Sequence, residues 1–185
     1  RGDVASACKP VFTHFLLLAL DEGRLGSLDE PVLRWEPRLA DLNPALAHKD
    51  RAITWRHFAT QTSCYGLAEA PGTAFAYNDW SMALFVDLLF PKVHGIPWTE
   101  VDARLLRPRL TDPLGCEDDP TLVGQGTGDR AGRLAISPRD FARFGQLYLQ
   151  HGRWQDRSLI REELVRLATT SPSAPAGMSW PRGSR

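Results

Sequence analysis

The feature that most constrains this chain is an apolar segment, residues 11–20 (Val-Phe-Thr-His-Phe-Leu-Leu-Leu-Ala-Leu), which directly follows Ser6-x-x-Lys9-Pro. In a helix these side chains would make most of the circumference apolar, which is typical of a helix buried on nearly all sides. Proline is tolerated in a first helical turn, and Gly23 lies where a left-handed C-cap would end the helix. The segment is too short to span a bilayer. It therefore predicts a central core helix with Ser6 and Lys9 at its N-terminus.

Ser6 and Lys9 have the residue types and the spacing of a nucleophile and its proton partner. A serine hydroxyl is a weak nucleophile until a base takes its proton. A lysine one helical turn away lies on the same face, and desolvation of its ammonium would lower its pKa. Lysine is scarce here, since Lys49 and Lys92 are the only others. The alternative is a plain helix start in which Ser6 is the N-cap residue.

Tyr77 is the second residue with a possible chemical role. It lies between a Pro-Gly turn and the helical apolar pattern of residues 80–90. A tyrosine close to a lysine ammonium has a lowered pKa and can act as a general base. Ser6, Lys9 and Tyr77 could then form an acyl-transfer apparatus in which the lysine and the tyrosine share the serine proton. The alternative is an aromatic side chain that packs beside a helix cap.

Composition excludes several classes of function. The formal net charge is zero and the pI is about 7.1, so nothing favours nucleic acid or an anionic membrane as a partner. Three cysteines cannot form a disulfide framework, and the five histidines are scattered. We therefore expect no metal site and no cofactor. The expected partner is a small-molecule or peptide substrate, and the cellular location stays open.

Local patterns predict a mainly helical chain. Thr54, Asn78 or Asp79, and Ser137 followed by Pro138 are typical helix starts. Pro91 is expected to end the third helix. Residues 107–130 are expected to be irregular, and no regular strand is evident. Residues 1–170 should form one region, and the Ser/Pro/Gly-rich residues 171–185 a disordered tail. Further helices are expected over 54–62, 80–90, 97–106, 138–150 and 162–168.

The order of the motifs resembles that of a known superfamily. After Ser6-x-x-Lys9-Pro come "DEGRLGSLDEPV", "ITWRHFATQTS", "PGTAFAYNDWSMAL", "DPLG" and "AGRLAISPRDFARFGQLYLQHGRW". This series is similar to that of the serine beta-lactamase-like superfamily, which includes class C beta-lactamases, D-alanyl-D-alanine carboxypeptidases and related esterases. The resemblance implies that Ser6 is the acylated nucleophile, Lys9 its proton partner and Tyr77 the tyrosine of the Tyr-x-Asn motif. Asp79 takes the asparagine position, whose side chain orients the substrate and the lysine.

The sequence departs from the family pattern at several positions. Asp79 replaces the asparagine, and its carboxylate is expected to hold Lys9 in the charged form. Cys64 and Arg133 stand where the family has glycine. The third motif of the family, a Lys-Thr-Gly or His-x-Gly on a sheet strand, does not occur in these residues. In the family that strand also supplies the second of the backbone amides that donate hydrogen bonds to the oxyanion formed during acyl transfer.

The expected fold is thus the helical lobe and nucleophile helix of an α+β beta-lactamase-like fold, with most of the antiparallel sheet missing. The expected function is that of a serine hydrolase that forms an acyl-enzyme from an ester, a beta-lactam or a D-alanyl peptide. The alternative is a catalytically inactive fragment or pseudoenzyme that serves as a helical binding module. Without the sheet, an apolar face of the first helix is expected to be exposed and to favour self-association.

Overall fold

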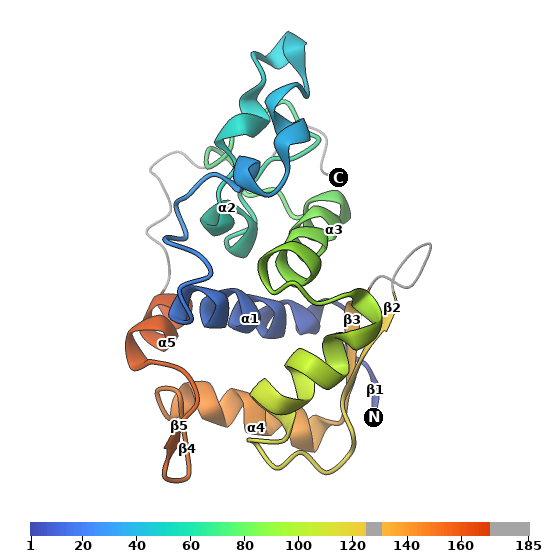
Figure 1. Ribbon diagram of the computed structural model, residues 1–185, viewed down its shortest axis with the longest axis vertical. Coiled ribbons are helices and arrows are strands. Elements are labelled where there is room, and N and C mark those ends of the chain that lie inside the picture. Colours follow the sequence, from blue (N-terminus) through green and yellow to red (C-terminus); the bar gives the residue numbers. More distant parts are fainter. Residues whose placement is uncertain (125–130, 171–185) are drawn as a thin grey trace.

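A computed structural model describes residues 1–124 and 131–170, and α1 (Lys9–Asp21) lies at its centre (Figure 1). α2 (Trp55–Ala59) and α3 (Asp79–Leu88) lie on one side of α1, whereas α4 (Pro138–Leu149) and α5 (Glu162–Thr169) lie on the other. The predicted mainly helical fold is confirmed.

α1 is buried because the segments on both sides of it contribute apolar side chains. Val11, Phe15 and Leu16 have no exposed surface, and Phe12 retains only 1%. Phe12 and Phe15 each meet the ring of Phe90 edge-on, with centroids 5.8 and 6.0 Å apart. Gly23 has the left-handed backbone expected of the C-cap, with φ +70°. The expectation of an exposed apolar face on this helix is therefore wrong, because the described chain itself covers these side chains.

Short turns connect the helices. The segment between α1 and α2 is a series of single 3-10 turns. After α3 the chain continues through a π-helical turn, Leu89–Val93, and later through a longer π-helix, Asp102–Thr111. Pro91 lies inside the first of these, so the expected stop there is wrong. A π-helical turn accommodates a proline because the missing N–H interrupts a ladder that is already displaced. The 3-10 turns between helices are Val32–Arg34, Pro37–Ala40, Pro44–Leu46, Lys49–Ala52 and Trp98–Glu100.

Strands are present, contrary to the expectation. β1 (Gly2–Asp3), β3 (Ala131–Ile136) and β2 (Thr121–Gly124) form an antiparallel sheet in the order β1-β3-β2. Gly2 is paired with Ile136, so the start of the chain is held against a strand more than a hundred residues away. β4 (Arg153–Trp154) and β5 (Arg157–Ser158) form a small hairpin. Both sheets are small, which agrees with the prediction that most of a larger sheet is missing.

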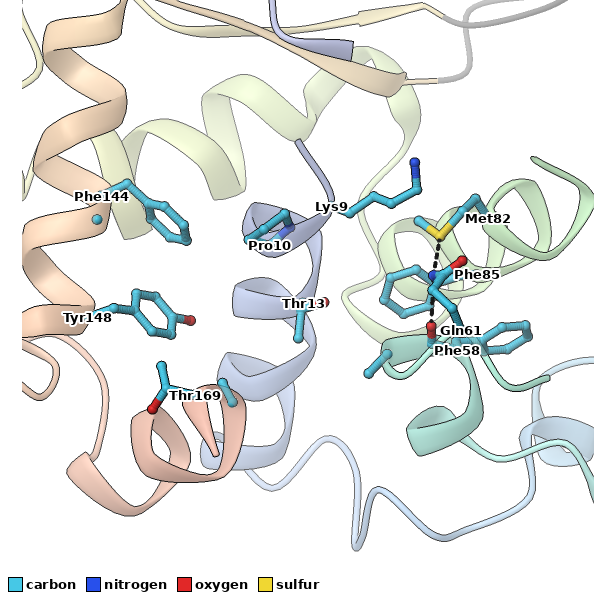
Figure 2. Close-up of a pocket in the computed structure, with 13 residues that line it drawn as sticks. Lys9, Pro10, Thr13, Phe58, Gln61, Met82, Phe85, Phe144, Tyr148 and Thr169 are labelled. Carbon is cyan, nitrogen blue, oxygen red and sulfur yellow. Dashed lines mark hydrogen bonds between the residues drawn. The ribbon is translucent and has the colours of Figure 1, made fainter. Parts of the chain in front are cut away.

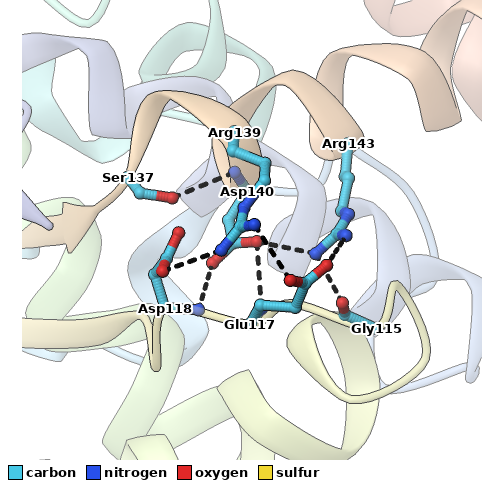
Figure 3. A network of polar contacts seen from close by, with 7 residues as sticks. All are labelled: Gly115, Glu117, Asp118, Ser137, Arg139, Asp140 and Arg143. Carbon is cyan, nitrogen blue, oxygen red and sulfur yellow. Dashed lines mark hydrogen bonds and ion pairs between the residues drawn. The ribbon is translucent and has the colours of Figure 1, made fainter.

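A polar cluster joins the loop that precedes β2 to α4 (Figure 3). Ser137 caps α4 as predicted, accepting the N–H of Asp140 at 3.1 Å. The carboxylate of Asp140 is fully buried and accepts the backbone N–H groups of Glu117 (3.1 Å) and Asp118 (2.8 Å). Arg143 pairs with the same carboxylate at 2.8 Å. The cluster therefore holds the loop that precedes β2 against the first turn of α4.

Two sequence predictions fall wholly or partly outside the described residues. The predicted tail, residues 171–185, and part of the predicted irregular segment, residues 125–130, lie outside the described residues. No helix within the described residues combines the length and the apolar character needed to cross a membrane.

Candidate active site

The turn that carries Ser6 is built on the edge of the sheet. β1 ends at Asp3, and residues Ala5–Cys8 form a single 3-10 turn that leads directly into α1. The N–H of Val4 donates to the carbonyl of Leu134 on β3 at 3.0 Å. Ala5 has φ +48°, a left-handed conformation that alanine rarely adopts. Ser6 thus lies within the turn rather than at the N-cap of α1, and its side chain forms no cap hydrogen bond.

The structure brings Ser6, Lys9 and Tyr77 into mutual contact. Lys9 Nζ donates to Ser6 Oγ at 3.0 Å and to Tyr77 Oη at 2.8 Å. Ser6 Oγ and Tyr77 Oη are joined by a short hydrogen bond of their own. Lys9 Nζ also lies 4.6 Å from the centroid of the Tyr77 ring, within cation–π range. A closed triangle of hydrogen bonds therefore links a hydroxyl, an amine and a phenol.

Hydrogen bonding at this triangle alters the acidity of the phenol. The hydrogen bond from Lys9, followed by that with Ser6, lowers the pKa of Tyr77 below its usual value. The negative charge of Asp79 acts in the opposite direction and raises that pKa. The Tyr77 side chain is 47% exposed, so solvent and a substrate can reach it. The arrangement favours a tyrosinate at lower pH than an isolated tyrosine would allow.

The backbone around Tyr77 is held by neighbouring turns. The N–H of Ala76 donates to the carbonyl of Gln61 at 2.7 Å. On the other side of Tyr77, Asn78 caps α3 and accepts the N–H of Ser81 at 2.7 Å. Ser81 Oγ is in turn joined to Ser63 Oγ at 2.6 Å, and both serines are fully buried. The backbone of Tyr77 is therefore fixed between two anchored residues, and its exposed side chain is held by the hydrogen bonds to Lys9 and Ser6.

Asp79 and Cys8 differ from the three residues of the triangle. Asp79 is the first residue of α3 and is exposed, and within the described residues no hydrogen bond or ion pair joins it to Lys9. Its influence on the site is the electrostatic effect on Tyr77 described above. Cys8 is 2% exposed, and burial raises the pKa of its thiol. Cys8 is therefore a core residue and not an activated thiol.

A mostly apolar cavity of ≈ 440 Å³ begins beside Lys9 (Figure 2). Pro10 and Thr13 of α1 line its middle, Tyr148 of α4 lies on one side and Met82 of α3 on the other. Gln61 also lines the cavity, and its side-chain N–H donates to Met82 Sδ at 3.0 Å. Sequence reasoning did not find this cavity, because its walls come from helices far apart in the chain. No cluster of three or more potential metal ligands occurs among the described residues.

Comparison with known families identifies the chain. A family model described as Beta-lactamase matches residues 1–184. The chain belongs to the Beta-lactamase family. This family and its structural neighbours are hydrolases, as the resemblance of the motifs implied. No curated protein sequence matches this Beta-lactamase family member.

Solved structures share the fold. A candidate beta-lactamase from Bacteroides dorei DSM 17855 matches with a TM-score of 0.72 and 21% identity, over 99% of this chain and 61% of that one. A candidate 6-aminohexanoate-dimer hydrolase from Bacillus anthracis matches with a TM-score of 0.67 and 16% identity, over 97% and 56%. A class C beta-lactamase from Rhodobacter sphaeroides matches with a TM-score of 0.61 and 22% identity, over 90% and 54%. This family member thus spans about half to three-fifths of the length of these structures.

Proposed function

We propose that this chain carries the nucleophile of a serine hydrolase that acts through an acyl-enzyme on Ser6. The observation that supports this most directly is the closed triangle of hydrogen bonds among Ser6, Lys9 and Tyr77. Membership of a hydrolase family supports the same reaction class. The proposed substrates are an ester, a beta-lactam or a D-alanyl peptide, all of which offer a carbonyl carbon to a hydroxyl nucleophile.

The hydrogen-bond directions suggest how the proton moves. Lys9 Nζ donates to both oxygens, and either hydroxyl could donate in the hydrogen bond between Ser6 Oγ and Tyr77 Oη. The proposed reaction begins with Ser6 as the donor in that bond and with Lys9 as an ammonium. In the proposed reaction Tyr77 takes the Ser6 proton as Oγ bonds to the substrate carbonyl carbon. The ammonium of Lys9 stabilises the phenolate before the attack. The proton then passes to the leaving group as its bond to the carbonyl carbon breaks, which yields the acyl-enzyme.

Hydrolysis of the acyl-enzyme uses Tyr77 and Ser6 again, with water as the nucleophile. Tyr77 takes a proton from a water molecule, whose oxygen attacks the acyl carbonyl carbon. The bond to Ser6 Oγ then breaks, and Oγ recovers a proton from the phenol. Ser6 lies in the turn before α1, where the positive end of the helix dipole favours the negative charge of the tetrahedral intermediates.

The second candidate is a catalytically inactive helical module. The observation that favours it is that Lys-Thr-Gly and His-x-Gly do not occur in these 185 residues, so this chain by itself supplies no third-motif donor to the oxyanion. Loss of one oxyanion donor costs about 100- to 1,000-fold in rate. This candidate predicts that the triangle persists as a structural remnant without measurable acylation.

Intact-protein mass spectrometry distinguishes the two candidates. The chain is incubated with a fluorophosphonate and, separately, with a penicillin, and Ser6→Ala is treated in parallel. Circular dichroism first establishes that both proteins are folded. A single adduct that disappears in Ser6→Ala supports the hydrolase, and a penicillin adduct narrows the substrate to beta-lactam-like acyl donors. Folded protein without any adduct supports the inactive module.

A further inference from the structure

Asp3 binds the turn of Ser6 from the strand that precedes it. One carboxylate oxygen of Asp3 accepts the N–H of Ala5 at 2.7 Å, and the other lies 3.0 Å from Arg133 Nη1. A carboxylate that bonds the backbone two residues ahead forms an Asx-turn, a standard way to hold a tight bend. Here the bend is the one that delivers Ser6 to the triangle.

The backbone of this bend requires support. Ala5, the residue immediately before Ser6, has φ +48°. Alanine disfavours this region because its Cβ crowds the backbone, so the conformation persists only where surrounding contacts impose it. The hydrogen bond from its N–H to Asp3 is one such contact. A second is the hydrogen bond from the N–H of Ala7 to the carbonyl of Val4, 3.1 Å long.

Arg133 connects this bend to the neighbouring strand. It lies on β3, next to Leu134, whose carbonyl accepts the Val4 N–H. The carbonyl of Gly132, on the other side of Arg133, receives a weak contact from Cys8 Sγ at 3.9 Å. Three successive residues of β3 therefore contact the segment from Asp3 to Cys8. The N–H of Ala5, and after it Arg133, lower the pKa of Asp3, so the carboxylate is charged at neutral pH.

We propose that Asp3 and Arg133 are positioning residues for the nucleophile: the pair holds the left-handed bend at Ala5 so that Ser6 Oγ meets Lys9 and Tyr77. The effect on reactivity rests on the proposed function of Ser6, whereas the support of the bend does not. Arg133 replaces a glycine of the family pattern, and the pair gives this arginine a role that does not require contact with substrate.

Displacement of a reacting atom by about 1 Å can cost on the order of 100-fold in rate. Asp3→Ala removes both interactions, and we expect the second-order rate of Ser6 labelling by a fluorophosphonate to fall about 10- to 100-fold. Asp3→Asn keeps an oxygen for the Ala5 N–H but loses the charge. We expect this conservative variant to recover most of the lost rate. Arg133→Gln should cause a loss similar in size to that of Asp3→Asn.

The test combines labelling rates with hydrogen–deuterium exchange of the Ala5 amide and with thermal unfolding. Glu100→Ala is the matched control, because the ion pair of Glu100 with Arg104 is similarly exposed and belongs to a segment without site residues. The expected result is slower labelling and faster Ala5 exchange in Asp3→Ala, with melting temperatures like that of the control. The proposal is overturned if Asp3→Ala labels at the wild-type rate, or if labelling falls only in proportion to a lowered melting temperature.

Failure of the proposed function gives a different result. If wild-type protein takes up no fluorophosphonate, the hydrolase proposal is refuted while the exchange measurement still decides whether Asp3 holds the bend. Faster hydrogen exchange at Ala5 in Asp3→Ala would then still show that Asp3 supports the bend, and unchanged exchange would show that it does not.

Discussion

Replacing Tyr77 by phenylalanine is the most selective perturbation of the proposed site. Tyr77→Phe removes the oxygen that contacts Lys9 and Ser6 but keeps the ring 4.6 Å from Lys9 Nζ. A positioned general base contributes about 100- to 10,000-fold, which corresponds to roughly 3–5 kcal/mol of activation free energy. The rate of Ser6 labelling should fall by a factor in this range.

The same substitution should scarcely affect folding stability. The Tyr77 side chain is 47% exposed, so water replaces most of what the lost hydroxyl contributed. We expect the free energy of unfolding to change by less than about 1 kcal/mol. For a chain of this size, a change of about 1 kcal/mol would shift the melting temperature by roughly 2–4 °C. The combination of a large kinetic effect and a small thermodynamic one separates a chemical role from a packing role.

The chain supplies its own control in Tyr148. This tyrosine hydrogen-bonds to the buried ring of His14 at 3.1 Å, and burial raises the pKa of its hydroxyl. Tyr148→Phe should lower the melting temperature while the labelling rate of the folded protein stays near that of wild type. The assay is the time course of fluorophosphonate adduct formation by mass spectrometry, with urea unfolding on the same samples. A Tyr77→Phe protein that labels within threefold of the wild-type rate would refute the assignment of Tyr77 as the base.

In Asp79→Asn, the rate of Ser6 labelling should begin to rise at a lower pH than in wild type, because the Asp79 charge raises the pKa of Tyr77. A pH–rate profile measures this shift, and an unchanged profile contradicts the prediction. Asp140→Ala should lower the free energy of unfolding in urea by about 3–5 kcal/mol, because it leaves a buried polar cluster without its acceptor. The hydrogen bond from Arg38 is the main reason that the pKa of Glu36 falls to about 2 in the folded state. Because this pKa is depressed, the charged Glu36 contributes its full stabilisation of the fold above about pH 4.5 and loses it as the pH falls towards 2. Acid unfolding titrations of wild type and Glu36→Gln should therefore differ between these two pH values.

Local sequence signals predict the capped α-helices, whereas the expected helix over 97–106 is a 3-10 turn (Trp98–Glu100) followed by a π-helix (Asp102–Thr111) that extends into the segment expected to be irregular. Caps at Thr54, Asn78 and Ser137 are observed, because a capping side chain acts on backbone groups within three residues. The contact between Ser6 and Lys9 could be predicted for the same reason, since their spacing brings them together on one helical turn.

Long-range contacts could not be derived from local patterns. Nothing in the neighbourhood of Tyr77 shows that it meets Ser6, seventy-one positions away, and only the family resemblance suggested their contact. β1 and β2 are too short to display an alternating pattern, and their pairing with β3 is a property of the tertiary fold. The predicted stop at Pro91 is wrong because the rule that proline ends a helix assumes an α-helical ladder, which the chain has already left at Leu89.

The pairing of β1 with β3 sets the order in which the molecule can assemble. Asp3 and Arg133 are 130 positions apart in sequence, so a ribosome must release most of the described chain before the bend at Ala5 finds its support. Closing so large a loop is entropically costly and slows folding relative to local helix formation. α1 can form early in synthesis, but its reactive end is completed among the last events. A nascent chain that stalls before β3 emerges would thus display the serine without the geometry that activates it.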